Sequence, residues 1–141
     1  MRISDIMKKE PEYLLVHASS RAAARRMRDG DVGFLPICDR HRRVIGMITD
    51  RDLAVRVVAE GLECDLPVRD VMTREVVACH PHDDLLRAQR IMEASGKSRL
   101  VVLDAEGRLA GVVSRADLTD HDVEHAASVV ANVAGPLDCR G

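Results

Sequence analysis

The chain has 141 residues, a formal net charge of −2 and an apolar content of 46%, which together favour a folded protein with its own core over a disordered chain. It contains one Tyr, one Phe and no Trp, so a protein that stacks nucleic-acid bases on aromatic side chains is hard to build from it. The charge balance gives no general support for phosphate neutralisation, so nucleic acid is not an expected partner.

The four cysteines are scattered and form no Cys-x-x-Cys pair, which argues against a zinc ribbon. The first residues lack the apolar core, about 7–15 residues long, of a signal peptide. No window reaches the run of about 18 apolar residues that a membrane span requires. We therefore expect a cytoplasmic protein with reduced thiols and no membrane partner.

The first half of the chain shows the patterns of a strand, a helix, two strands and a second helix. The first helix carries Ser20, Ala23 and Met27 on one face and ends at Gly30. The two strands after it are joined by RHRR, a poor turn because it lacks glycine. We expect strands at 13–16, 35–39 and 44–48, the first helix at about 20–30 and the second helix from Thr49.

After a linker around 61–67, the second half shows the same order of elements. Asp83 or Asp84 is expected to cap a helix that carries Leu85, Ala88 and Met92 on one face and ends at Gly96. We expect strands at 76–79, 100–104 and 109–113, a turn at 105–108 (AEGR), and a last helix from Ser114. The tail, 128–141, has no counterpart in the first half, and we expect a loose end or an added helix there.

The two halves are copies of one unit. A shift of 65 residues aligns 5–53 with 70–118 without a gap and gives 13 identities in 49 positions. Chance would give roughly three or four at this composition. The identities include DIMKKE against DVMTRE, and the final Asp-Leu of both copies. The chain is therefore a tandem repeat.

Each copy ends its last strand with a hydroxyl residue and an Asp three positions later: IGMITDRDL at 45–53 and AGVVSRADL at 110–118. One interpretation is structural. A Ser or Thr at a helix N-cap with an acid three residues on is a variant of the capping box, although Asp is shorter than the usual Glu or Gln. Such a cap contributes about 1 kcal/mol to the free energy of unfolding.

The other interpretation is a ligand site. A helix N-terminus favours phosphate, the Thr49 or Ser114 hydroxyl can add a hydrogen bond to it, and the Asp52 or Asp117 carboxylate can accept both hydroxyls of a ribose. Micromolar binding needs about 8 kcal/mol, more than one carboxylate supplies. An apolar slot for a base and a neighbouring cation must therefore contribute, and both interpretations stay open at this point.

The repeated motifs resemble a pair of cystathionine-beta-synthase-type (CBS) domains, also called a Bateman module. The matching elements are DIMKKEPEYLLVHASS, GFLPICD and IGMITDRDL in one copy and DVMTREVVACHPHDDLL, SRLVVLD and AGVVSRADL in the other. The resemblance implies an α+β fold in which two β-α-β-β-α repeats pack about a pseudo-twofold axis. We place repeat 1 at 1–62, repeat 2 at 63–127 and the tail at 128–141.

The resemblance also implies clefts between the repeats that bind an adenosine nucleotide: AMP, ADP, ATP or S-adenosylmethionine. Asp52 and Asp117 would take the ribose, with Thr49 and Ser114 toward phosphate. Arg51 and Arg115 would supply the cations. The expected base-lining residues are Gly33, Phe34, Leu35 and Pro36 in repeat 1, Ser98, Arg99, Leu100 and Val101 in repeat 2, and Tyr13 and Ala78 from the first strands.

We therefore expect a regulatory module, not an enzyme, that forms a homodimer and acts on a separate partner protein when the nucleotide binds. The main alternative is a ligand-free dimerising scaffold in which both Asp residues are only caps. A third possibility is a metal-dependent hydrolase. HDVEH at 121–125 places His121 and His125 one helical turn apart with Glu124 as a base, but too few residues follow to supply the third ligand easily.

Overall fold

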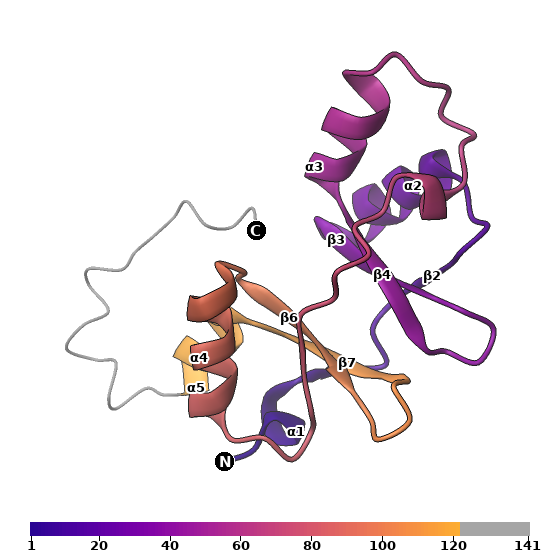
Figure 1. The fold of residues 1–141 in the computed structure, drawn as a ribbon. Coiled ribbons are helices and arrows are strands. Elements are labelled where there is room, and N and C mark those ends of the chain that lie inside the picture. The colour runs from indigo at the N-terminus through magenta and orange to yellow at the C-terminus, as the bar shows by residue number, and fades with distance from the viewer. Residues whose placement is uncertain (122–141) are drawn as a thin grey trace. The chain divides into compact units, whose positions relative to one another are not determined.

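The computed structural model describes residues 1–121, which form two compact units (Figure 1). We call the unit made of Glu12–Val76 and Glu106–Leu109 the first unit. The second unit is made of Met1–Pro11, Val77–Ala105 and, among the described residues, 110–121. Each unit has its own sheet and its own hydrophobic core.

The first unit contains a three-stranded sheet in the order β2-β3-β4, with β2 parallel and β4 antiparallel to the central β3. Its elements are β2 (Leu14–Leu15), α2 (Ser20–Gly30), β3 (Phe34–Cys38), β4 (Val44–Thr49), α3 (Asp50–Leu53), the π-helix η1 (Ala54–Val58) and the 3-10 helix η2 (Val68–Asp70). The face of α2 predicted from the sequence is confirmed, since Ser20, Ala23 and Met27 are buried.

The second unit contains a four-stranded sheet in the order β1-β7-β6-β5. Its elements are α1 (Ile3–Ile6), β1 (Lys8–Lys9), β5 (Ala78–Cys79), α4 (Leu85–Ser95), β6 (Arg99–Leu103), β7 (Leu109–Ser114, whose first residue belongs to the first unit) and α5 (Arg115–His121). Asp84 caps α4 and Gly96 ends it in a left-handed conformation, as the sequence predicts. The helices α4 and α5 lie side by side against this sheet (Figure 1).

The predicted β-α-β-β-α order is confirmed in both repeats, with strand bounds shifted by one or two residues. The fold is of the mixed α+β class, with two sheets. The expected tail falls outside the described residues.

The segment that leads into each repeat packs in the unit of the other repeat, so the two leading segments are exchanged. We call 1–11 and 66–76 the leading segments. Ile3 of the first leading segment is fully buried in the core of the second unit, and Val68 of the second leading segment is fully buried in the core of the first unit. Ile3 and Val68 are equivalent under the 65-residue shift. Repeats defined by sequence and units defined by packing therefore differ at these segments.

Each leading segment also extends the sheet of the unit that it joins. Lys8 pairs with Val112 in β7, and Thr73 pairs with Met47 in β4, in the same antiparallel register. Two equivalent glycines make room for this approach. A Cβ at Gly111 would lie 2.8 Å from the carbonyl oxygen of Lys8, and a Cβ at Gly46 would lie 3.0 Å from that of Thr73. Close backbone contact thus accounts for a glycine repeated in mid-strand.

Candidate ligand-binding site

The first corner, Thr49 to Asp52, joins β4 to α3. The Thr49 hydroxyl accepts a hydrogen bond from the Asp52 backbone N–H at 3.1 Å, and Asp52 Oδ2 accepts one from the Thr49 N–H at 3.0 Å. Both halves of the capping box are therefore formed, even though Asp is shorter than the usual acid at this position. One oxygen of the Asp52 carboxylate is committed to the helix start.

Asp52 has two further partners, neither of which was predicted from the sequence. Thr73 Oγ1 lies 3.3 Å from Asp52 Oδ1 and 3.4 Å from Oδ2, and donates to the carboxylate. Arg56 Nε lies 3.8 Å from Oδ1. The residue is only 9% exposed. The carboxylate at the first corner is thus buried and surrounded by protein donors.

The second corner, Ser114 to Asp117, joins β7 to α5 and has the same capping box. The Ser114 hydroxyl accepts from the Asp117 N–H at 3.1 Å, and Asp117 Oδ2 accepts from the Ser114 N–H at 2.8 Å. Asp117 is half-buried, and within the described residues its Oδ1 accepts no hydrogen bond. A carboxylate offers about four acceptor sites, so, as far as residues 1–121 are concerned, Asp117 Oδ1 can still accept hydrogen bonds.

The residues predicted to line the base are tied to the corners by equivalent hydrogen bonds. The Gly33 carbonyl accepts from the N–H of Asp50, and the Ser98 carbonyl accepts from the N–H of Arg115. Phe34 pairs with Thr49 across the sheet. The Ser98 hydroxyl is buried and lacks a hydrogen-bond partner in the described part of the chain. Strands β3 and β6 therefore begin beside the corners.

The other predicted site residues differ in exposure. Arg51 and Arg115 are exposed, and Arg115 donates to the Lys97 carbonyl at 3.5 Å. Tyr13, Ala78 and Arg99 are partly exposed, whereas Leu35, Pro36, Leu100 and Val101 are buried. Ala78 lies next to Val101 because β5 and β6 pair in parallel. The buried members contribute to the cores, whereas the two arginines are exposed to solvent.

The described residues, 1–121, contain no group of three or more His, Cys, Asp or Glu side chains that could hold a metal ion. His121 is the last of them, and Glu124 and His125 of the HDVEH motif lie outside the described residues. Burial raises the pKa of the Cys38 thiol to about 11 and that of the Cys79 thiol to about 12, so neither is a thiolate at neutral pH. No helix within 1–121 is both long enough and apolar enough to span a membrane.

The model of the CBS domain family matches the chain twice, at 3–59 and 68–124. The chain belongs to the CBS domain family. Both matches contain one strand-to-helix corner, and the matches leave out the tail.

Two bacterial proteins of similar length are related to this chain in sequence. Hypoxic response protein 1 of Mycobacterium tuberculosis is 33% identical over 123 residues, which cover 86% of this chain and 85% of that protein. The CBS domain-containing protein YhcV of Bacillus subtilis is 30% identical over 134 residues, or 94% of each chain. Neither relative carries the name of an enzyme.

Solved CBS structures share the fold. Hypoxic response protein I, crystallised with two coordinated zinc ions, has a TM-score of 0.79 and 30% identity over 86% of this chain and 98% of that chain. The CBS domain pair of protein MJ0100, in complex with 5′-methylthioadenosine and S-adenosyl-L-methionine, has a TM-score of 0.77 and 26% identity over 86% of this chain and 94% of that chain. The structure of CBSX2 in complex with AMP, 21% identical with a TM-score of 0.77 over 88% of this chain and 97% of that chain, supports the fold alone.

The contacts of Thr73 and Arg56 with Asp52 were not predicted from the sequence, for two different reasons. Thr73 belongs to the second repeat and contacts the first corner only because the leading segments are exchanged. Arg56 follows Asp52 by four residues, a spacing that brings side chains together on a helix. This spacing could therefore have predicted the contact between Arg56 and Asp52. The equivalent positions in the other repeat are Lys8 and His121, so a comparison of the repeats would have marked both positions as different.

Proposed function

We propose that this CBS domain pair is a regulatory module that binds an adenosine-containing ligand through the carboxylates of Asp52 or Asp117. The observation that carries the proposal is the bound 5′-methylthioadenosine and S-adenosyl-L-methionine in a CBS pair 26% identical to this chain with a TM-score of 0.77. In support, each corner combines a carboxylate, a hydroxyl and an exposed arginine in a short stretch of chain.

The proposed roles follow from the chemistry of these groups. A carboxylate accepts two hydroxyl hydrogen bonds, which suits the 2′ and 3′ hydroxyls of a ribose. The exposed Arg51 and Arg115 would meet a phosphate or a carboxylate of the ligand. The Ser98 hydroxyl, which is buried and has no hydrogen-bond partner among residues 1–121, offers a further polar contact beside the second corner. AMP, ADP, ATP and S-adenosylmethionine all carry the ribose that these groups would hold.

The output of the module is part of the same proposal. A ligand changes a protein's behaviour only through different affinities for two of its states, so binding must favour one arrangement of the module over another. We place the module in the cytoplasm as a homodimer that controls a separate partner protein. Light scattering with and without AMP measures the dimer and any change in its assembly.

Calorimetric titration of the chain with AMP, ATP and S-adenosylmethionine tests the proposal, together with Asp52→Asn and Asp117→Asn. Asn keeps one oxygen for the cap and loses the charged second acceptor. We expect at least one of the two variants to lose about tenfold or more in affinity, since a hydrogen bond to a charged group contributes about 1.5–3 kcal/mol. The melting temperature of the variant that loses affinity should stay nearly unchanged.

Asp120→Asn is the matched control, because Asp120 is exposed on α5 and lies outside the corner. It should leave affinity unchanged. The second candidate function, a ligand-free dimerising scaffold, is favoured by the complete capping boxes at both corners. Absence of heat and of any melting shift with all three ligands would support the scaffold and reject the nucleotide module.

A further inference from the structure

The two corners differ in what already touches the carboxylate. We propose that Thr73, assisted by Arg56, determines which corner takes the ligand: it occupies Asp52 and leaves Asp117 as the preferred site. This inference rests on the proposed function, because it assumes that the carboxylates bind an adenosine-containing ligand. It adds a specificity-determining residue that comes from the opposite repeat.

Thr73 is held firmly where its hydroxyl meets Asp52. Its N–H donates to the Met47 carbonyl at 2.8 Å, and its carbonyl accepts from the Met47 N–H at 2.9 Å. The residues before it, Val71 and Met72, are buried in the core of the first unit. A hydroxyl fixed in this way remains beside the carboxylate and loses little conformational entropy when it binds.

Arg56 strengthens the same arrangement from the helical side. Its Nη1 donates to the carbonyls of Val71 at 3.2 Å and Met72 at 3.0 Å. These hydrogen bonds hold the second leading segment next to the corner. Its Nε lies 3.8 Å from Asp52 Oδ1. Asp52 therefore has a neutral donor and a cation on the oxygen that a ribose would approach.

The second corner lacks this arrangement although the backbone is the same. Lys8 pairs with Val112 in the register in which Thr73 pairs with Met47. Lys8 is exposed, and among the described residues it makes no hydrogen bond to Asp117. A ribose would have to displace Thr73 to reach Asp52 Oδ1, whereas no donor from residues 1–121 occupies Asp117 Oδ1.

Calorimetry with AMP on variants that retain one corner each tests the inference, with S-adenosylmethionine in a parallel series. Asp52→Asn retains the second corner and Asp117→Asn retains the first. We expect Asp52→Asn to bind AMP about tenfold or more tightly than Asp117→Asn, the factor that corresponds to about 1.4 kcal/mol. Adding Thr73→Val to Asp117→Asn removes the competing hydroxyl with nearly the same shape and should tighten binding about tenfold.

A reciprocal variant makes the test independent of how well Thr73→Val folds. Lys8→Thr in the Asp52→Asn background places a hydroxyl at the equivalent position of the second corner, where it should weaken AMP binding. Thr119→Val is the matched control: its hydroxyl donates to the Arg115 carbonyl within α5, and its removal should leave affinity unchanged.

The outcomes separate this inference from the proposed function. Equal affinity at both corners, or no tightening by Thr73→Val together with no weakening by Lys8→Thr, overturns the assignment of Thr73 while the nucleotide module stands. No binding of AMP or S-adenosylmethionine to the unmodified chain and to every variant overturns the proposed function and this inference with it. Tightening at the first corner and weakening at the second support both.

Discussion

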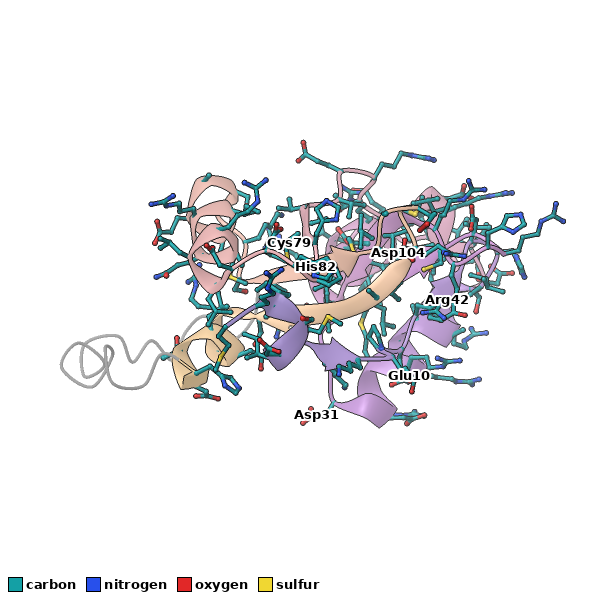
Figure 2. The ribbon with its side chains drawn as sticks, turned by 90° about the horizontal axis from the view of Figure 1, so that it is seen from below. Glu10, Asp31, Arg42, Cys79, His82 and Asp104 are labelled. Carbon is teal, nitrogen blue, oxygen red and sulfur yellow. The ribbon has the colours of Figure 1, made fainter. Side chains whose placement is uncertain are left out.

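The C-cap residues of α2 and α4 are Asp31 and Gly96, which occupy equivalent positions in the two repeats. Both residues adopt a left-handed backbone, with φ of 52° at Asp31 and 70° at Gly96. The same contrast recurs at the turns between the paired strands, where Arg42 has φ of 66° and Gly107 has φ of 79°. Repeat 2 uses glycine at both places, and repeat 1 uses residues with a side chain (Figure 2 labels Asp31 and Arg42).

The turn at Arg42 explains how the sequence RHRR forms a turn without glycine. Arg42 Nη2 donates to the Leu109 carbonyl at 2.7 Å, and its own carbonyl accepts from the Leu109 N–H at 2.9 Å. Asp39 Oδ1 accepts from the backbone N–H groups of His41 and Arg43. These hydrogen bonds offset a left-handed conformation that costs roughly 1–2 kcal/mol outside glycine. The backbone path is shared by the repeats, and the residues that stabilise it differ.

Both repeats keep the features that receive the exchanged leading segment. A large aliphatic residue, Ile3 or Val68, fills the core of the opposite repeat's unit, and Gly46 or Gly111 lets the segment approach. We infer from this comparison that the packing of the leading segments restricts the choice of residues more strongly than the turn conformations do. The following predictions test that ranking.

The largest effect is expected at the buried residues of the leading segments. Ile3→Ala should lower the free energy of unfolding by about 3 kcal/mol, since removing a large aliphatic side chain from a core costs about 2–5 kcal/mol. Amide hydrogen exchange should show the loss of protection in the second unit, although Ile3 precedes repeat 1 in sequence. Val68→Ala should have its effect in the first unit.

Val58→Ala is the control for these substitutions, because Val58 is 73% exposed and its loss should change stability by no more than about 0.5 kcal/mol. If Ile3→Ala instead lowered the hydrogen-exchange protection of the first unit, the assignment of the first leading segment to the second unit would be wrong.

A smaller effect is expected at the glycines beneath the leading segments. Gly111→Ala should cost about 2 kcal/mol, within the range of about 1–3 kcal/mol for overpacking, because the Lys8 carbonyl that it meets cannot rotate away. Gly46→Ala should cost somewhat less, since its nearest contact is the flexible Met72 side chain. Urea unfolding measures both variants.

Gly30→Ala is the matched control. The nearest atom to its added Cβ is an oxygen of the Glu12 side chain at 2.9 Å, which can move aside. A loss at Gly30 as large as that at Gly111 would show that the leading segment is not the cause.

The smallest effect is expected at the helix ends, and its sign should differ between the repeats. Gly96→Ala should lower the free energy of unfolding by about 1 kcal/mol, because nothing lies within 4 Å of the added Cβ and only the left-handed backbone is penalised. Asp31→Gly should raise it by about 0.5 kcal/mol through relief of the same penalty. Thermal melting of the two variants measures both signs, and a stabilising Gly96→Ala would contradict the argument.

Much of the fold was predictable because it depends on short-range patterns. Helix faces follow from the spacing of Ser20, Ala23 and Met27, and the end of α4 follows from Gly96. The corners were also predictable, since a capping box involves residues three apart that contact each other whenever the helix forms. The motifs repeated in both copies resembled the CBS domain family, and the family model confirms that resemblance.

The contact between Asp52 and Thr73 could not be predicted in this way. Thr73 is 21 residues away in the chain, and its contact exists because the second leading segment pairs with β4 and not with the sheet of its own repeat. A strand edge accepts any segment with free N–H and C=O groups, so spacing alone does not say which segment will occupy it. Packing therefore made two corners of the same design differ. One carboxylate is surrounded by protein donors, and within residues 1–121 the other has an oxygen that accepts no hydrogen bond.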